Sequence, residues 1–442
     1  AQLILKPKII DLKNKNIEFN NIELNNTILS IERDYMSVDD SIRLARANEN
    51  KTQKDLLWQI RATMLKMKQN SFDLIHEVKP GSAREINEDR FSIHDISSKI
   101  ETIFIKNDFY GFDIKTMQFE VNDFLKIKNI IGGAEINKQS AKLSNFLIES
   151  EESRAEFDLR LKYPSLSEIN ENLKSLNLFF DFEANTGSND LAFLLQDVNL
   201  FKKYSNIELA GELSGSLSQM QLKRFTLQAE KALNISANAR LKNLYDIDQL
   251  YADFQLENLS INKNGFLNYL PDTLLPQSLN LPDTILIEGH LSGGRSNINS
   301  NLNINTSLGN LNFKLSMEMD TVQRMEYFSA QTQMKEFDLG SFLFMQDTIG
   351  HISLTGTLEG NTTDFKNPEL AMDLLIQKMN ALQYEYKDIS IKGDYKERFF
   401  KGTANVKDEN IDMKFTGKID MADSLTELNF NLNLPRTNLQ AL

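Results

Sequence analysis

The sequence predicts an all-β protein built on a long, twisted antiparallel sheet with a few short helices. Three observations predict this class. Apolar and polar residues alternate over many short segments, Asn and Asp separate these segments, and amphipathic stretches of helical length are few. A chain with this pattern presents one apolar and one polar face along most of its strands.

The alternation is cleanest in the segment LNFKLSMEM, residues 311–319. Its odd-numbered positions are all apolar and its even-numbered positions are polar, which predicts a strand with one buried face. The same alternation recurs on both sides of this segment. The apolar positions with this period that we expect to face the interior are Leu302, Ile304, Leu311, Phe313, Leu315, Met317, Met319, Ile411, Met413, Phe415, Phe430 and Leu432.

Three predicted strands that contain glycine have nearly the same sequence pattern. The segments IELAGELSGSL (207–217), ILIEGHLSGGR (285–295) and ISLTGTLEGNT (352–362) each carry two glycines four residues apart. A short apolar segment closed by Asp precedes each of them, at 191–197, 265–272 and 341–347. Roughly 70 to 80 residues separate the copies, which favours one structural unit used three times with variable loops. Glycine in such a strand permits a bulge, a sharp twist or close backbone approach.

Other local signals are weaker. Residues 165–176, SLSEINENLKSL, have a capping residue and helical apolar spacing, which predicts a helix of two to three turns. Residues 37–55 are polar and predict an exposed insertion. The proline-rich stretch 270–283 predicts a crossover loop or a sheet edge.

Composition excludes several function classes. With 49 basic and 62 acidic side chains, the net charge of −13 disfavours nucleic acid as a partner. The chain has no cysteine, so disulfides and thiolate metal sites are excluded. It shows neither an uninterrupted apolar run long enough to cross a bilayer nor a signal-peptide pattern. Both ends look like cuts through a longer protein.

The residues required for enzyme chemistry do not assemble into a motif. His76, His94, His290 and His351 are isolated, without metal-binding spacing or a nearby nucleophile motif. We therefore expect a protein without catalytic residues, metal or cofactor. The pair Asp246 and Asp248 lies in a turn-like segment. Tyr384 and Tyr386 share one strand face, which fits a cross-strand aromatic pair or the rim of a groove.

A sheet with one apolar face has to cover it, because leaving a Leu, Phe or Met exposed forgoes ~1.5–3 kcal/mol each. Three arrangements can do so without helices: packed sandwiches, a closed barrel, or a long sheet folded so that its apolar faces meet across a groove. In the third arrangement the face is available to a long apolar ligand such as an acyl chain. Met317, Met319 and Met413 fit either a flexible ligand lining or an ordinary core.

Several ordered segments resemble one family. The elements that carry the resemblance are Asp338-Leu339-Gly340, the strand with Gly356 and Gly360, YEYKDISIKGDY at 384–395 and VKDENIDMKFTGKID at 406–420. Together they resemble the TamB family of translocation and assembly module proteins, in the AsmA-like group, over roughly 90–434. The N-terminal membrane helix and the C-terminal domain of that family have no counterpart in this sequence.

The resemblance implies a taco-like antiparallel sheet with an apolar groove that conducts phospholipid between the inner and outer membranes of a Gram-negative envelope. It implies a periplasmic location, acyl chains as ligands along the twelve positions named above, and an outer-membrane barrel protein of the TamA or BamA type as a partner of the full-length protein. A chaperone-like role in outer-membrane protein assembly, by strand addition, is the alternative. A surface adhesin or a purely structural β-sandwich array is a third interpretation.

The resemblance and the repeats together give an expected division of the chain. Residues 1–150 would form an N-terminal groove segment that contains the exposed insertion. Residues 151–283 would form middle groove units, and 284–442 the C-terminal groove units of a fragment.

Overall fold

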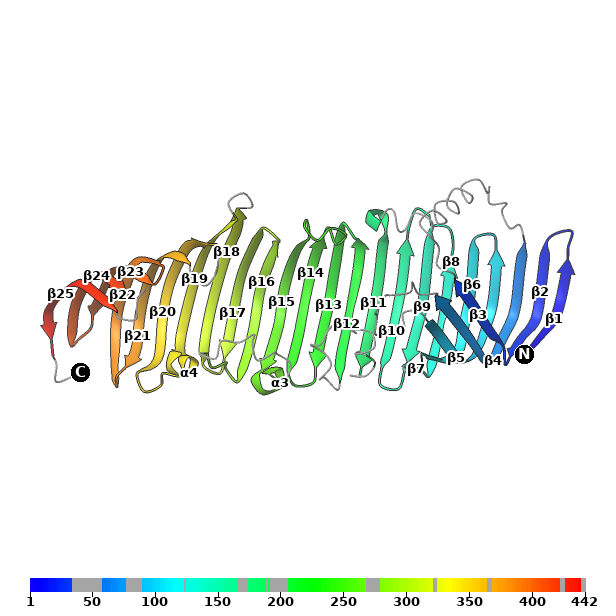
Figure 1. Ribbon diagram of the computed structural model, residues 1–442, viewed down its shortest axis with the longest axis horizontal. Coiled ribbons are helices and arrows are strands. Elements are labelled where there is room, and N and C mark those ends of the chain that lie inside the picture. The colour runs from blue at the N-terminus through cyan, green and yellow to red at the C-terminus, as the bar shows by residue number, and fades with distance from the viewer. Residues whose placement is uncertain are drawn as a thin grey trace. The chain divides into compact units, whose positions relative to one another are not determined.

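The prediction of an all-β protein is confirmed. The computed structural model describes residues 1–33, 58–76, 90–122, 125–165, 173–187, 190, 206–267, 279–320, 324–363, 368–421 and 426–438. Most of these residues lie in β-strands, which run side by side within each part of the chain (Figure 1). The chain divides into two compact units, Ala1–Leu217 and Ser218–Leu442. The expected divisions after residues 150 and 283 remain predictions.

The first unit is a mixed sheet. Its elements are β1 (Gln2–Asp11), β2 (Asn16–Asn25), β3 (Ile28–Arg33), β4 (Gln59–His76), β5 (Arg90–Lys106), β6 (Phe109–Val121), β7 (Leu125–Ile127), β8 (Asn129–Ile136), β9 (Ser140–Glu149), β10 (Arg154–Lys162), the 3₁₀ turn Leu173–Ser175, β11 (Asn177–Thr186) and β12 (Ile207–Ser216). Most neighbouring strands pair antiparallel, as predicted, but β2 and β3 both pair parallel to β4. The expectation of a wholly antiparallel sheet is therefore wrong at this point.

Asn70 explains how one long strand pairs with two short ones. Strand β4 pairs with β2 along its first half and with β3 along its second half, and Asn70 lies at the junction with 4% of its surface exposed. Its side-chain oxygen accepts from the Thr27 amide at 3.0 Å, and its amide nitrogen donates to the Leu24 carbonyl at 2.9 Å. These bonds satisfy the backbone where the chain bends between β2 and β3, since a buried backbone group without a partner is costly.

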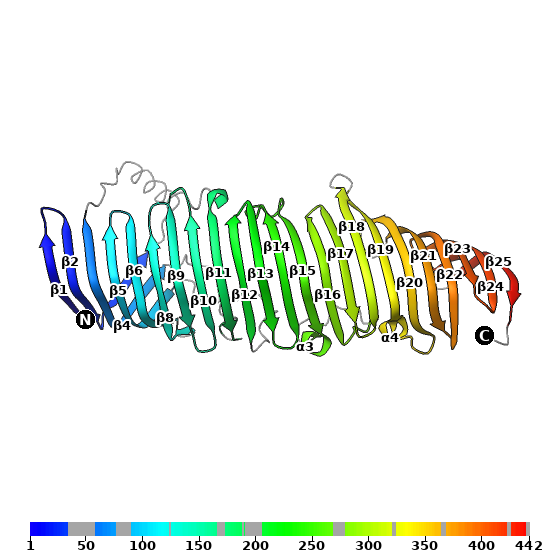
Figure 2. The same cartoon turned by 180° about the vertical axis from the view of Figure 1, so that it is seen from behind.

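The second unit is an antiparallel meander. Its elements are β13 (Gln219–Ala229), β14 (Leu233–Lys242), β15 (Tyr251–Asn262), α3 (Lys263–Leu267), β16 (Thr284–Gly294), β17 (Asn297–Thr306), β18 (Gly309–Asp320), β19 (Met325–Asp338), α4 (Leu339–Leu343), β20 (Ile349–Thr362), β21 (Glu369–Ala381), β22 (Tyr384–Lys396), β23 (Phe399–Lys407), β24 (Ile411–Asp420) and β25 (Glu427–Thr437). Each strand pairs with the next from β13 to β25. The view from behind in Figure 2 follows the same order from strand to strand within this unit. Among the described strands, β25 pairs with β24 alone, so the sheet of this unit is open there.

Four bulges in the described strands share one hydrogen-bonding device. In each case a residue other than glycine adopts a left-handed conformation at a register shift, and a polar side chain of the neighbouring strand accepts from its backbone N–H. The pairs are Gln69 with Ser97 (3.1 Å), Asn145 with Asp158 (2.9 Å), Arg224 with Asn238 (2.9 Å) and Glu336 with Ser353 (3.0 Å). A bulge adds local twist and bends its strand, so these positions curve the sheet within each unit.

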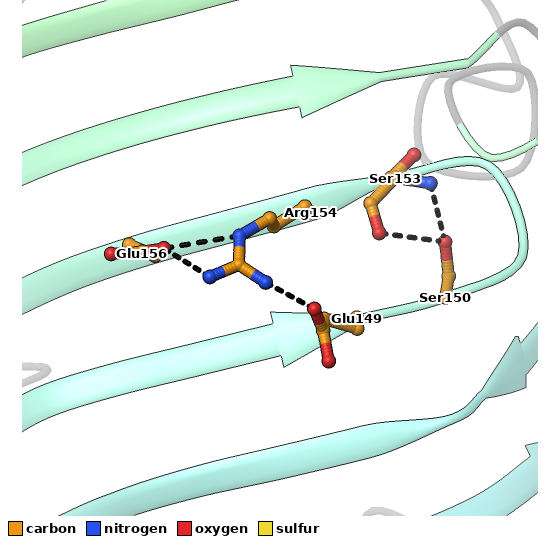
Figure 3. Close-up of polar contacts among 5 residues, drawn as sticks. All are labelled: Glu149, Ser150, Ser153, Arg154 and Glu156. Carbon is orange, nitrogen blue, oxygen red and sulfur yellow. Dashed lines mark hydrogen bonds and ion pairs between the residues drawn. The ribbon is translucent and has the colours of Figure 1, made fainter.

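The turn between β9 and β10 shows how polar side chains close the strand connections (Figure 3). The Ser150 hydroxyl accepts from the Ser153 amide at 2.8 Å. As a donor, this hydroxyl is shared between the Asp190 carboxylate and the Ser153 carbonyl, which lies 3.3 Å away. On the solvent side, the Arg154 guanidinium reaches Glu149 on one strand and Glu156 on the other. Exposed ion pairs add little stability, so the serine pair is the main determinant of this turn.

The predicted helical segments form short helices or lie outside the described residues. Of the helix predicted at 165–176, residues 173–175 form a 3₁₀ turn and 166–172 lie outside. The insertion at 37–55 and the segment 191–197 also lie outside, as does most of the proline-rich stretch, of which 279–283 is not a strand. The segments at 265–272 and 341–347 each contribute to a helix of one turn, α3 and α4.

The glycine-marked strands are β12, β16 and β20, so they recur at every fourth strand of the chain. Within the second unit two copies are complete: α3 precedes β16 and its meander, and α4 precedes β20 and its meander. Gly289 of β16 has φ +138°, and an added Cβ would overlap the carbonyl oxygen of Asn301 on β17. At Gly360 of β20 an added Cβ would overlap the Glu369 carbonyl oxygen. The interpretation that these glycines permit close backbone approach is confirmed.

We expect Gly289→Ala to lower the free energy of unfolding by about 1–3 kcal/mol, because alanine is strained at this φ and meets the neighbouring backbone. Urea unfolding followed by circular dichroism measures this change. Asn303→Ala, an exposed position on the adjacent strand, is the control and should stay within about 0.5 kcal/mol of the parent. Equal stability of the two variants would contradict the proposed role of the glycine.

Candidate functional site: the apolar face of the second unit

The apolar positions predicted from the sequence lie on one face of the second unit. On β18, Leu311, Phe313, Leu315 and Met317 are half-buried, while the polar residues between them are exposed. On β17, Leu302 lies opposite Phe313, and Ile304 lies opposite Leu311. Met319, at the end of β18, is 38% exposed and is the least covered of the predicted positions on this strand.

Strand register joins the predicted residues of β18 to those of β24 and β25. We define four rows on this face, each made of residues that are direct partners on consecutive strands. The first row crosses β18 to β24, and the other three cross β18 to β25. The first row is Leu311, Met334, Leu354, Ile376, Ile389, Val406 and Met413; the second is Phe313, Thr332, Gly356, Leu374, Ile391, Ala404, Phe415 and Leu432; the third is Leu315, Ala330, Leu358, Met372, Gly393, Gly402, Gly417 and Phe430; the fourth is Met317, Phe328, Gly360, Leu370, Tyr395, Phe400, Ile419 and Leu428. Phe313 and Phe415, 102 positions apart by their residue numbers, thus lie in one row.

The first row is the covered part of this face. Leu354, Ile376, Ile389 and Val406 are buried. They form one core cluster with three further buried residues that are not part of the row, Phe337, Ile352 and Ile411. Helix α4 packs against this cluster through Leu339 and Phe342. The Phe342 ring meets the Phe337 ring edge-on at 5.6 Å between centroids. The first row is therefore a conventional hydrophobic core.

Helix α4 is fixed in place at both ends. At its start, the Asp338 carboxylate accepts from the Ser341 amide at 2.9 Å and from the Ser341 hydroxyl at 2.6 Å. Burial raises the pKa of Asp338, but these hydrogen bonds outweigh burial and lower it below its usual value. At its end, the Asn280 amide donates to the Phe342 carbonyl at 2.8 Å. Helix α4, which covers the first row, is thus held by two segments that are far apart in the sequence, those of Asp338 and Asn280.

The second, third and fourth rows remain partly open. Their large side chains on β18 to β24 are mostly half-buried, and no described residue with a large side chain is less than 2% exposed. On β25 the exposed fractions rise to 58% for Leu428, 45% for Phe430 and 46% for Leu432. The rings of Phe415 and Phe430 still pack against each other, with centroids 5.3 Å apart. Exposed apolar surface of this kind makes these rows a candidate interaction site.

The predicted residues differ in how well they suit a ligand. Ile411 is buried in the core cluster, where Met413 also packs, so these two side chains are mainly part of the protein's own core. Phe313, Leu315, Phe415, Phe430 and Leu432 lie in the open rows. Alternation in the sequence predicts on which face of the sheet a side chain lies, but not how deeply it is buried. The sequence therefore could not separate the core residues from those of the open rows.

The first unit carries an aromatic row that the list of predicted positions missed. Phe146 on β9, Phe157 on β10, and Phe180 and Phe182 on β11 form a chain of ring contacts with centroids 4.9–5.7 Å apart. All four side chains are half-buried. The signal that could have found them is phenylalanine at alternate positions of consecutive strands.

A polar network closes the chain connections next to the core cluster. The Asp408 carboxylate, on a residue that is 4% exposed, accepts from the Tyr384 hydroxyl, from the Lys387 amide at 3.1 Å and from the Asn410 amide at 3.0 Å. Tyr384 packs edge-on against Tyr386 of the same strand at 4.8 Å. The prediction that the two tyrosines share one face of a strand is confirmed. Their register partners on β21 are Ala381 and Met379, so neither tyrosine forms a cross-strand aromatic pair with that strand.

The titration of Asp408 follows from this network. Burial raises its pKa, but the hydrogen bonds from Tyr384, Asn410 and Lys387 outweigh burial and lower it below the usual value of 3.8. The same carboxylate raises the pKa of Tyr384, because the hydroxyl donates to a charged acceptor. The ionised form of Asp408 thus stabilises the folded protein.

The described residues with acid, base or metal-binding side chains are dispersed over several strands and turns. In the part of the chain that the structure describes, no three His, Asp or Glu side chains gather as a metal site would require. The four histidines lie in strands β4, β5, β16 and β20, and Asp246 and Asp248 lie in the turn before β15. No helix among the described residues is long and apolar enough to cross a membrane.

Comparison with known proteins adds no relative to this description. No family model, curated protein or solved structure matches the chain. The fold and the site therefore rest on the residues of this chain.

We expect Asp408→Asn to lower the free energy of unfolding by about 1–3 kcal/mol at neutral pH, because it weakens a buried, charge-assisted network. The folded-state pKa is the lower one, so the stabilisation is complete well above pH 3.8 and is lost as the pH falls through that value toward the folded-state pKa. The variant should lose this part of the acid dependence. Urea unfolding at several pH values measures it, with the exposed neighbour Glu409→Gln as control; parallel pH profiles of parent and Asp408→Asn would contradict the assignment.

Proposed function

We propose that the open rows of the apolar face hold phospholipid acyl chains, and that the protein carries phospholipid between the inner and outer membranes along a hydrophobic β-groove. The observation that carries this proposal is the continuity of the second, third and fourth rows from β18 to β25. An acyl chain needs a long apolar surface and makes no directional bonds, which these rows offer. The head group would stay in water beside the polar side chains at the strand ends.

Several features favour movement over tight binding. The rows contain small residues, Thr332, Gly356, Ala404 and three consecutive glycines of the third row, between large ones such as Phe313 and Phe415. Such a surface offers many sites of similar chemistry. A ligand held by weak, repeated contacts can shift from one to the next without a large barrier.

The resemblance to the TamB family agrees with this proposal and adds its cellular setting. On that basis the protein would act in the periplasm of a Gram-negative envelope, as part of a bridge whose full-length form has an inner-membrane anchor and an outer-membrane barrel partner of the TamA or BamA type. The mechanism involves no catalytic residue and no cofactor.

A second candidate function rests on the edge strand β25. This strand pairs with β24 alone among the described strands, and its apolar residues Leu428, Phe430 and Leu432 alternate with asparagines. Between Glu427 and Arg436 it carries no charged residue that would discourage pairing with another chain. Such an edge could accept a strand from an outer-membrane protein precursor, as a chaperone-like assembly factor would.

The first test is mass spectrometry of organic extracts from protein purified without detergent. We expect phospholipid in reproducible amounts above one molecule per chain, because the rows provide several equivalent sites. The same extraction from a soluble protein carried through the identical purification is the control. Folded protein free of lipid would contradict the lipid proposal and favour the assembly function.

The second test places a charge in the open rows. Phe313→Glu or Phe415→Glu should reduce transfer of a fluorescent phospholipid between vesicles by roughly tenfold or more, because a carboxylate beside an acyl chain is poorly solvated. Asn312→Glu, on the exposed face of the same strand, is the matched control for Phe313→Glu and should transfer normally. Circular dichroism confirms that each variant is folded. Unchanged transfer by both folded phenylalanine variants would exclude these rows as the lipid path.

A further inference from the structure

The opposite, polar face of the second unit contains a depression of about 550 Å³ across β22 to β25. It lies on the back of the third row, whose glycines form part of its floor. An added Cβ on Gly402 would overlap the Lys392 carbonyl oxygen and the Phe400 ring, so the backbones lie close together here. The polar side chains that line the depression are Lys392, Asp394, Lys401, Thr403, Thr416, Lys418, Asn429 and Asn431.

Two lysines face each other across neighbouring strands in this depression. Lys401 of β23 and Lys418 of β24 are direct partners in the strand register. Like charges directly opposite each other destabilise a sheet. Among the described residues neither ammonium group forms an ion pair, whereas Lys392 pairs with Asp373 of β21 at 2.8 Å. Asp394 of β22, which is the register partner of Lys401 on its other side, is the one carboxylate among the lining residues. Three lysines and one carboxylate make the lining locally positive on a chain of net charge −13.

The other lining residues add hydrogen-bond donors at the same place. Thr403 and Thr416 are partners on β23 and β24, one register step beyond the glycines from the two lysines. Asn431 lies opposite Thr416, and Asn429 lies opposite Lys418 on β25. Ammonium, hydroxyl and amide groups all donate to the oxygens of a phosphate group, and lysine binds phosphate as a compact point charge.

We propose that this depression binds the phosphate group of a phosphate ester, which sits between Lys401 and Lys418 and cancels their repulsion. The site is separate from the open rows, because it lies on the other face of the same strands. Its existence therefore does not depend on the proposed lipid path. The phosphate could belong to a phospholipid head group or to a soluble phosphate ester, and the experiment distinguishes the two.

The test is calorimetric titration of the full chain with glycerol 3-phosphate in low-salt buffer. We expect binding that weakens by about tenfold or more in the double variant Lys401→Gln/Lys418→Gln and that falls with added salt. The matched control is Lys314→Gln/Lys335→Gln, which removes the same charge from exposed positions of β18 and β19. Equal weakening in both double variants, or no binding by the parent, would overturn the proposal.

A flotation assay identifies the source of the phosphate. If the site takes a lipid head group, vesicles of phosphatidylcholine with added phosphatidic acid should carry the parent and the control variant, but not the Lys401/Lys418 double variant. If the site takes a soluble ester, all three proteins should stay behind while the calorimetric difference persists. Flotation of all three proteins alike would place vesicle binding elsewhere, and the calorimetric comparison alone would then decide the site.

Discussion

Everything in the second unit depends on one constraint: an alternating sequence gives a sheet one apolar face, and this face has to be covered. In the first row the protein's own side chains cover the apolar face, since α4 and the core cluster bury Leu354, Ile376 and Ile389. The other rows do not, because the described residues leave their side chains half-exposed. The first row is therefore a stabilising core, whereas the open rows are the surface proposed to bind a ligand.

The proposed groove would require a curved sheet, because a flat sheet would offer a ligand no concave surface. Bulges bend individual strands, and their left-handed residues are held by polar side chains of the next strand, as in Glu336 with Ser353. Glycines such as Gly289 add positions where two backbones lie closer than any side chain allows. Both devices are local, so they can recur along the chain without a common core.

The two faces of the sheet then support different chemistry. The apolar face offers many weak, similar contacts, which suits a ligand that moves along it. The polar face concentrates charge where strand register brings Lys401 and Lys418 together. The same pairing of β23 with β24 creates both surfaces, because neighbouring positions of a strand point to opposite faces.

The sequence by itself determined the all-β class, the glycine-marked repeats and which side of each strand is apolar, because a side-chain period of two is a local property. Only the tertiary structure decided the register that aligns Phe313 with Phe415, the burial of Ile411 in a core, and the parallel pairing of β2 and β3 with β4. Each bulge shifts the register of all residues beyond it, and the local alternation of the sequence does not predict that shift.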